Sequence, residues 1–373
     1  MKRLMVIFGT RPEAIKMAPV ILALKATRTF DVKVCITGQH RGMLDQVLGI
    51  FGIVPDFDLN IMKPGQDLTD ITANVLAGMR DVNRKWRPEW TLVHGDTTTT
   101  LAASFASFYE RIPVGHVEAG LRTHNKYSPW PEEINRHVTG VLATLHFAPT
   151  SIARQNLIDE GIDPANVEIT GNTVIDALLC ATKKLKDDPS LMKQFKERFS
   201  FLDASKKLIL VTGHRRENFG EGFQRICKAL ARLSKRSDIE ILYPVHLNPN
   251  VQQPVNELLG GRKNVYLTEP LDYLPFIYLM ERSHLIITDS GGIQEEAPSL
   301  GKPVLVTRDV TERPEAVDAG TVRLVGTDPE KIFNEADNLI DNQDDYERIS
   351  RMHNPYGDGS ASDRIIKRLL LEA

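Results

Sequence analysis

Short apolar runs rich in β-branched residues alternate with longer amphipathic stretches along the chain. This alternation predicts βαβ units, in which parallel strands form a sheet and helices cover its faces. In the first half, strands are expected at Leu4–Phe8, Lys33–Thr37, Thr91–His94, Pro113–Val117 and Leu145–Ala148. Helices are expected from about Glu13 and over Asp67–Trp86, Thr97–Glu110 and Pro131–Ala143.

A second series of the same kind begins near Lys207, after a charged stretch at 183–201 that predicts a helical connector. Its strands are expected at Leu208–Thr212, Glu240–Val245, Asn264–Leu267, Leu285–Thr288 and Val304–Val306. A length of 373 residues suits two domains. We predict two parallel-sheet α/β domains facing a cleft, residues 1–170 and 171–359, followed by a helix within 360–373 that could pack on either. Ligands of such sheets bind beyond the carboxyl ends of the strands.

The composition excludes several classes of function. Hydrophobic residues make up 42%, charged residues 25%, and the formal net charge is -3, which gives no electrostatic basis for binding nucleic acid. Any phosphate that the chain binds should therefore be small and held in a local pocket. The three cysteines are far apart, which argues against a disulfide framework. No apolar run approaches the roughly 20 residues that span a bilayer, so we expect a cytoplasmic protein without membrane insertion.

The segment Thr288–Glu296 follows an expected strand and leads into a helix. Gly291 and Gly292 lack side chains, so their N–H groups can approach an anion, and Ser290 adds a hydroxyl. The helix N-terminus adds about half a positive charge. This predicts a phosphate-binding turn, with an ordinary N-capped turn as the alternative. Glu296, about one helical turn further in, can accept both hydroxyls of a ribose.

The first turn of the chain, Gly9-Thr10-Arg11-Pro12, has neither P-loop nor dinucleotide-fold spacing. Arg11 could nevertheless clamp a phosphate, and Lys16 could add a point charge. Two surface cations at the start of a helix are the alternative interpretation.

Acidic side chains gather near the expected strand ends of the first domain. Asp96 and Glu118 each follow a strand, and Glu132 lies a little further on with Glu133 beside it. Like charges raise one another's pKa, which allows a carboxyl group to exchange protons near neutrality. Helix caps, or salt bridges to Arg122 or Arg136, are the alternative for any single acid. As a set they predict an active site.

In the second domain, His214 follows the first strand beside Arg215 and Arg216, where an imidazole could carry a proton or bind phosphate. A metal site is disfavoured, because the chain has no HExxH motif and no dense His/Cys cluster.

Taken together, these motifs closely resemble the bacterial non-hydrolysing UDP-N-acetylglucosamine 2-epimerases, over essentially the whole chain. The resemblance is carried by FGTRPEAIKMAP (8–19), VHGDTTTTLA (93–102), GHVEAGLRT (115–123), SPWPEEINR (128–136), GNTVIDALL (171–179), TGHRREN (212–218), YPVHLNPNV (243–251), TDSGGIQEEAPSLGKPVLVTRDVTERPEA (288–316) and NPYGDG (354–359).

The resemblance implies two Rossmann-like domains of the glycosyltransferase B type, with the last helix packed back on the first domain, and a homodimer. It implies reversible C2 epimerisation of UDP-N-acetylglucosamine to UDP-N-acetylmannosamine, through elimination of UDP to 2-acetamidoglucal and re-addition, without a cofactor or metal. It also points to precursor synthesis for surface polysaccharides such as enterobacterial common antigen.

The roles implied for individual residues follow the matching motifs. The acid/base set is Asp96, Glu118, Glu132 and His214. The substrate-binding set is Arg11, Lys16, Asp96, Glu118, His214, Leu271, Phe276, Ser290, Gly291, Gly292, Glu296 and Arg313. An activating second substrate molecule is implied beside Gln39, His40, Gln66 and His246, although some members carry an Arg where this chain has Gly65.

Three other functions remain open at this point. A retaining glycosyltransferase would share the fold but leave the acids unexplained. A hydrolysing epimerase would release UDP and free N-acetylmannosamine from nearly the same site. A non-catalytic nucleotide-sugar sensor would not need Asp96, Glu118, Glu132 and His214.

Overall fold

The computed structural model describes residues 1–38 and 41–372. Its internal contacts divide the chain into two compact units. The first, called here the N-terminal unit, comprises Met1–Ala177 and the chain from Tyr356 onward. The second, the C-terminal unit, comprises Leu178–Pro355. The division falls inside one helix, α7 (Thr173–Asp187).

The N-terminal unit contains a seven-stranded parallel sheet in the order β3-β2-β1-β4-β5-β6-β7. Starting from a central strand and growing outward on both sides is the Rossmann-like arrangement, and it places the ends of β1, β4 and β5 side by side. Val6, for example, pairs with Val34 of β2 and Leu92 of β4. The strands are β1 (Lys2–Phe8), β2 (Phe30–Ile36), β3 (Phe57–Asp58), β4 (Trp90–His94), β5 (Val114–Val117), β6 (Leu145–Ala148) and β7 (Val167–Ile169).

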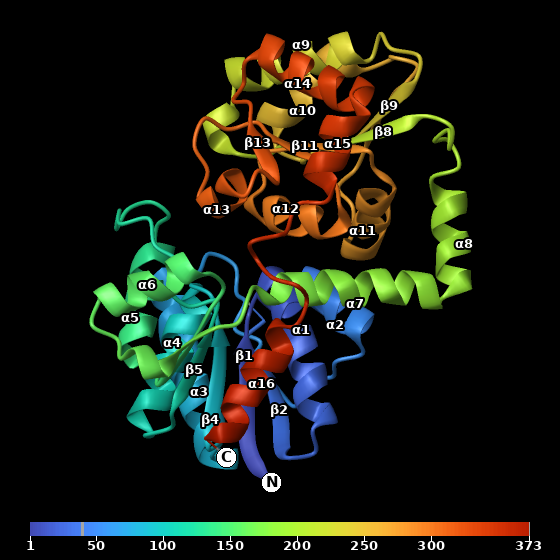
Figure 1. The fold of residues 1–373 in the computed structure, drawn as a ribbon. Coiled ribbons are helices and arrows are strands. Elements are labelled where there is room, and N and C mark those ends of the chain that lie inside the picture. Colours follow the sequence, from blue (N-terminus) through green and yellow to red (C-terminus); the bar gives the residue numbers. More distant parts are fainter. Residues whose placement is uncertain (39–40, 373) are drawn as a thin grey trace. The chain divides into compact units, whose positions relative to one another are not determined.

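Helices cover both faces of this sheet. On one face, apolar side chains of α3 and α4 pack on Met5, Ile7 and Val93. On the other face, α16 lies along α1, so the last helix closes the N-terminal unit (Figure 1). The helices are α1 (Arg11–Ala26), α2 (Arg41–Phe51), α3 (Leu68–Trp86), α4 (Thr98–Tyr109), α5 (Glu132–Leu142), α6 (Ser151–Asp159), the 3-10 turn η1 (Pro164–Asn166), the first part of α7, and α16 (Ala361–Leu371).

The C-terminal unit contains a six-stranded parallel sheet in the order β10-β9-β8-β11-β12-β13. Its strands are β8 (Lys207–Thr212), β9 (Ile239–Pro244), β10 (Val265–Thr268), β11 (Leu285–Thr288), β12 (Val304–Val306) and β13 (Val322–Leu324). Ile209, Ile241 and Ile287 face a core formed with α9, α10 and α14, while α11 and α12 lie on the other face (Figure 1). The remaining elements are α8 (Pro189–Arg198), η2 (Arg216–Asn218), α9 (Glu221–Leu233), α10 (Pro249–Leu259), α11 (Tyr273–Arg282), α12 (Gly291–Glu296), η3 (Ala297–Leu300), α13 (Pro314–Asp318), α14 (Pro329–Asp341) and α15 (Gln343–Ser350).

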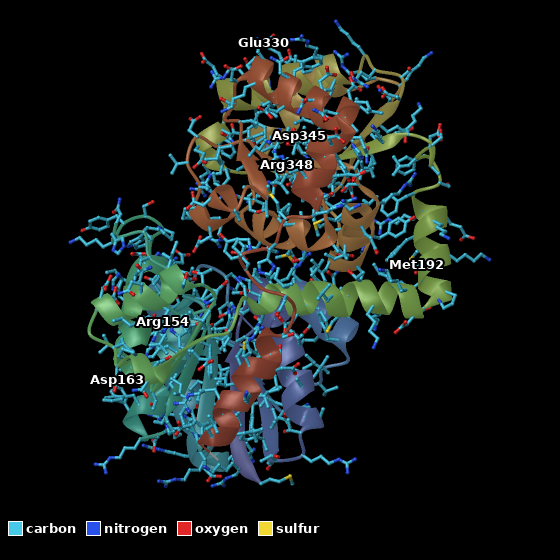
Figure 2. All side chains as sticks on the ribbon, viewed as in Figure 1. Arg154, Asp163, Met192, Glu330, Asp345 and Arg348 are labelled. Carbon is cyan, nitrogen blue, oxygen red and sulfur yellow. The ribbon has the colours of Figure 1, made fainter. Side chains whose placement is uncertain are left out.

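An ion-pair network fastens α15 to the edge of this second sheet. The carboxylate of Asp345 accepts hydrogen bonds from Arg323 on β13 at 2.7 Å and from Asn338 on α14 at 2.6 Å. Arg348 donates to the same carboxylate at 2.6 Å, and the two side chains lie together on α15 (Figure 2). Burial raises the pKa of Asp345, and these charge-assisted bonds lower it. The bonds have the larger effect, so the pKa of Asp345 is lowered.

The prediction of two parallel-sheet domains is confirmed, and each predicted strand lies within a few residues of an observed one. The predicted helical connector consists of two helices, the end of α7 and α8. Asp188 separates them, and its side chain caps the start of α8 by accepting from the N–H groups of Ser190 and Leu191. No helix in the described part of the chain is both long enough and apolar enough to cross a membrane.

Three buried histidines on β4, β5 and β6 predict acid-sensitive folding. Burial lowers the pKa of His116 to about 3, and of His94 and His146 to about 4. In the unfolded chain these groups take up protons near pH 6.5, whereas in the folded chain they stay neutral down to about pH 4 or below. Above pH 6.5 the histidines are neutral in both states, so protonation does not favour the unfolded chain and stability is at its full value. Stability decreases as the pH falls toward 4, by up to about 1.4 kcal/mol per pH unit for each group.

The measurement is the free energy of urea unfolding between pH 7.5 and pH 5. His116→Gln should give a shallower dependence of this free energy on pH than the wild-type chain, whatever its absolute stability. Equal slopes in the two proteins would contradict the assignment to His116.

Candidate functional site

The first group of polar side chains lies where β1, β4 and β5 end. Glu118 follows β5 with a left-handed backbone (φ 61°). Its Oε1 accepts hydrogen bonds from Lys16 of α1 and, at 2.8 Å, from Nδ2 of Asn172. Its Oε2 lies 3.5 Å from Nε2 of His94. Glu118 is thus held by groups from three different segments of the N-terminal unit.

Asp96 lies in the turn between β4 and α4, close enough to Glu118 and Glu132 for their charges to affect it. Burial raises the pKa of Asp96 to about 6. The guanidinium of Arg136, which donates to Oδ2 at 2.7 Å, opposes this rise, and the charges of Glu118 and Glu132 add to it. Asn135 donates to the backbone carbonyl of Asp96 at 2.9 Å. A carboxyl group with this pKa can both take up and release a proton near neutral pH.

Glu132 is the first residue of α5, and its neighbour Glu133 has a different task. The buried carboxylate of Glu133 accepts from the backbone N–H groups of Thr123 and His124 at 2.9–3.1 Å. These bonds and the charge of Arg136 outweigh burial and lower the pKa of Glu133. Glu133 therefore holds the loop before α5. The charge of Glu132, in contrast, acts on Asp96 and raises its pKa.

Glu13 joins the β1–α1 turn to the start of α4. Its buried carboxylate accepts from the N–H groups of Gly9 (3.0 Å) and Thr10 (2.7 Å), and from the hydroxyls of Thr97 (2.7 Å) and Thr100 (3.2 Å). A side chain at Gly9 would overlap the hydroxyls of Thr37 and Thr99, so the two turns touch. Burial raises the pKa of Glu13, against the effect of these bonds. This contact fixes the turn that carries Asp96 against the helix that carries Lys16.

The second group lies in the C-terminal unit, where β8 and β11 end. Asp289 is fully buried, and its Oδ2 accepts from the N–H groups of His214 and Arg215 at 2.8 Å. Its Oδ1 lies 3.2 Å from Nδ1 of His214. Although burial acts the other way, these contacts lower the pKa of Asp289. The carboxylate therefore points into the protein and organises the loop that carries His214.

The residues after Asp289 form the turn that the sequence predicts as a phosphate site. Gly291 and Gly292 are the first residues of α12, and a Cβ on Gly291 would lie 3.8 Å from the guanidinium groups of Arg215 and Arg313. Arg313, directly before α13, donates to Glu295, and its backbone N–H donates to Thr311 at 3.1 Å. Two guanidinium groups thus lie beside the first glycine of this turn.

The remaining predicted residues of the C-terminal unit lie on neighbouring elements. Leu271 precedes α11, Phe276 lies in its first turns, and Glu296 is the last residue of α12, largely buried. His246 follows β9, and its ring stacks on that of His214 with centroids 5.9 Å apart. The structure therefore brings a residue predicted for an activator site into contact with one predicted for catalysis.

Of the other predicted activator residues, Gln66 accepts from the backbone N–H of Lys63 at 2.7 Å just before α3. Gln39 and His40 lie outside the described residues. In the N-terminal unit, Arg11 is the first residue of α1, and Lys16 lies in its second turn. The helix-cap alternative does not apply to Asp96, since Thr97 caps α4. The salt-bridge alternative does apply, because Arg136 pairs with Asp96.

Two residues that the sequence analysis did not single out support this arrangement: Glu13 and Asn172. Arg136, which it named as an alternative salt-bridge partner of the acids, pairs with Asp96. Glu13 had a signal in the sequence, since Thr10 followed by an acid three residues later is a capping-box pattern. The contacts of Arg136 and Asn172 have no local signal, because their partners are 40 and 54 residues away. In the described chain, no group of three or more His, Cys, Asp or Glu is arranged to hold a metal.

Two Rossmann-like parallel sheets in one chain define a fold of the glycosyltransferase B type, and solved structures share it. The crystal structure of UDP-GlcNAc 2-epimerase from Neisseria meningitidis bound to UDP-GlcNAc is 55% identical, with a TM-score of 0.91 and 100% of both chains covered. The enzyme from Methanocaldococcus jannaschii in complex with UDP-GlcNAc and UDP is 32% identical, with a TM-score of 0.81 and 99% of both chains covered.

Sequence comparison agrees with the fold. The family model described as UDP-N-acetylglucosamine 2-epimerase matches residues 22–370. UDP-N-acetylglucosamine 2-epimerase of Escherichia coli K12 is 59% identical over 368 residues, which is 98% of each chain. The chain belongs to the UDP-N-acetylglucosamine 2-epimerase family, so the resemblance and the enzyme class that the motifs indicated are confirmed.

Proposed function

We propose that this protein interconverts UDP-N-acetylglucosamine and UDP-N-acetylmannosamine by inverting C2, without net hydrolysis. The proposal rests on the carboxylates Asp96, Glu118 and Glu132, which gather near the carboxyl ends of β4 and β5, and on the pKa of Asp96 near 6. Family membership supplies the substrate, and the acids supply groups that can move a proton at a carbon atom.

The reaction is proposed to run by elimination and re-addition. A carboxylate removes the C2 proton, the C1–C2 double bond forms, and the C1–O bond breaks so that UDP leaves with the bonding electrons. A second acid then protonates C2 of the 2-acetamidoglucal on the opposite face, and UDP oxygen returns to C1. The C2 proton has no adjacent carbonyl, so departure of a stabilised diphosphate must assist its removal. Two faces require at least two acid/base groups, which Asp96, Glu118 and Glu132 supply.

UDP is proposed to be held mainly by the C-terminal domain. Ser290, Gly291 and Gly292 would receive the diphosphate, with cationic groups around it, and Glu296 would hold the ribose. The proximity of Arg215 and Arg313 to Gly291 supports this assignment. The further contacts that we assign to the substrate are those of Arg11, Lys16, His214, Leu271, Phe276 and Arg313.

Gly291→Ala is the sharpest test of the diphosphate site. The new methyl group would meet its neighbours only at 3.8 Å, an ordinary contact, and the backbone there is helical. The fold should therefore be unchanged or slightly more stable. If the backbone approaches a phosphate, the methyl group will obstruct it, and we expect UDP to bind at least about tenfold more weakly, or about 1.4 kcal/mol. Calorimetric titration with UDP, beside a thermal unfolding curve, measures both; unchanged affinity would remove Gly291 from the site.

The proposed reaction itself is tested by NMR of the protein with UDP-N-acetylglucosamine in D2O. We expect UDP-N-acetylmannosamine, deuterium at C2 of both epimers and only traces of free UDP. Release of one UDP per substrate would assign the chain to hydrolysis instead. Absence of C2 exchange would refute the epimerase assignment.

The wider setting forms part of the proposal. We assign residues 1–170 to an acid/base domain and 171–359 to a UDP-binding domain, in a cytoplasmic homodimer that a second substrate molecule activates. We further propose a role in making precursors for surface polysaccharides such as enterobacterial common antigen. Sedimentation of the protein and the dependence of its rate on substrate concentration would examine the dimer and the activation.

A further inference from the structure

Asn172 is a buried residue between β7 and α7 whose hydrogen bonds reach three different segments. Its Nδ2 donates to Oε1 of Glu118 at 2.8 Å, and its Oδ1 accepts from the N–H of Val174 at 3.1 Å. Its backbone N–H donates to the carbonyl of Tyr356 at 2.7 Å. A single side chain therefore joins the start of α7 to the carboxylate beyond β5.

The chain passes between the two units twice, and both connections reach the N-terminal unit at Asn172. We call the place in the N-terminal unit where these two connections meet the crossing. The outgoing connection leaves through α7, and the returning one arrives at Tyr356. They pack closely, since a Cβ on Gly171 would lie 3.3 Å from Cα of Gly357. Both glycines have positive φ angles, 86° and 127°, that other residues rarely adopt.

Further bonds fasten the same crossing. Asp176 in the first turn of α7 accepts from the N–H groups of Ala361 (3.2 Å) and Ser362 (2.8 Å) at the start of α16. Arg364 of α16 donates to the carbonyl of Thr170 at 2.9 Å. The backbone of Asn172 is therefore fixed on both sides, so its amide group is a rigid donor for Glu118.

The asparagine side chain makes a hydrogen bond to Glu118 that the start of α7 does not require. Accepting from Val174 N–H at the start of α7 requires only an oxygen, and Ser, Thr or Asp do this as well as Asn. Only an amide also offers an N–H that reaches a carboxylate. The second bond serves Glu118, whose Oε1 it holds together with Lys16.

We propose that Asn172 is a positioning residue for the epimerisation, which fixes Oε1 of Glu118 and ties this carboxylate to the crossing of the two interdomain connections. The proposal rests on the proposed function, in which Glu118 exchanges a proton with the substrate. Asn172 does not itself touch the substrate; it acts through Glu118.

Asn172→Asp tests the proposal, since it keeps the oxygen for Val174 but replaces the donor with a second carboxylate. Hydrogen bonds to charged groups are stronger than those between neutral groups, so we expect kcat to fall about 10–100-fold when this bond is lost. The titratable groups that already act on Glu118 include Lys16, His94 and Asp96. A further negative charge beside Glu118 disfavours its ionised form, so the acid limb of the pH–rate profile should move to higher pH. UDP affinity should be unchanged.

Two further variants make the test independent of general damage. Asn172→Ser also keeps an oxygen for the start of α7 but adds no charge. It should therefore lower kcat without moving the acid limb. It serves as the test if Asn172→Asp does not fold. Asn156→Asp is the matched control, because Nδ2 of Asn156 donates at 2.9 Å to the carbonyl of Gly120, a neighbouring loop position, and not to a carboxylate. It should leave the acid limb in place.

Wild-type kcat and an unmoved acid limb in Asn172→Asp, or an equal shift in Asn156→Asp, would overturn the proposal. Either result would come from an enzyme that still exchanges the C2 proton, so the proposed function would stand. Lack of C2 exchange in the wild-type protein would instead refute the proposed function, and this proposal with it.

Discussion

Replacing Asp96 by Asn is expected to lower kcat by about 10²–10⁴-fold, the range that a positioned acid/base group contributes. Asn has nearly the same shape and keeps an oxygen for Arg136, so the turn between β4 and α4 should stay in place. What is lost is the ability to exchange a proton near pH 6, where burial and the neighbouring carboxylates put the pKa of Asp96. The rate of C2 deuteration in D2O measures the loss directly.

Two comparisons decide whether Asp96 acts on the chemistry. UDP affinity should be nearly unchanged in Asp96→Asn, since UDP is assigned to the other domain; a large loss would make Asp96 a binding residue. Asp81→Asn on α3, where an exposed carboxylate pairs with Arg80 at 3.1 Å, should retain the wild-type rate. Any pH–rate limb near pH 6 should disappear with Asp96 and persist without Asp81.

Replacing Asp289 by Ala is expected to lower the free energy of unfolding of the C-terminal unit by about 3–5 kcal/mol, the usual cost of leaving buried partners without their charge. The N–H groups of His214 and Arg215 would lose their acceptor. Asp289→Asn keeps one acceptor oxygen and should cost clearly less. Because the same loop carries His214, UDP should bind more weakly to both variants. Urea unfolding and calorimetric titration measure the two effects.

The stability that Asp289 contributes depends on pH. The pKa of Asp289 is lowered from its ordinary 3.8 in the folded protein. Its contribution to stability is therefore present above that value and lost as the pH falls through the lower, folded-state pKa. Asp203→Ala is a suitable control, since this exposed carboxylate accepts hydrogen bonds from the nearby Ser205 and should change stability much less. Equal losses in the two Ala variants would contradict the role of Asp289.

The sequence predicted both sheets because buried parallel strands appear as continuous apolar runs such as Leu285–Thr288. Three strands were not predicted. Phe57–Asp58 has two residues, and Val167–Ile169 and Val322–Leu324 have three each, with several exposed or half-buried positions. All three lie at sheet edges, where a strand needs less apolar surface and leaves little periodic pattern.

The sequence also predicted which residues follow strand ends, because adjacent parallel strands bring such residues to one edge. That reasoning placed Asp96 and Glu118 correctly beside each other. It could not say which way a side chain turns. Asp289 stands in the predicted phosphate turn, yet its carboxylate is buried beneath the loop of His214. Burial and partners from distant segments decide this, and neither is visible in a local motif.

The position of α16 bears on the order in which the chain folds during synthesis. Ile365, Ile366 and Leu369 on this helix are buried in the N-terminal unit, on the side where α1 lies. Domains of nascent chains usually fold in the order in which they leave the ribosome. Here residues 178–355 emerge before α16 does, so the unit that begins first lacks a buried helix until residues 361–371 are made. The second unit is therefore complete earlier than the first.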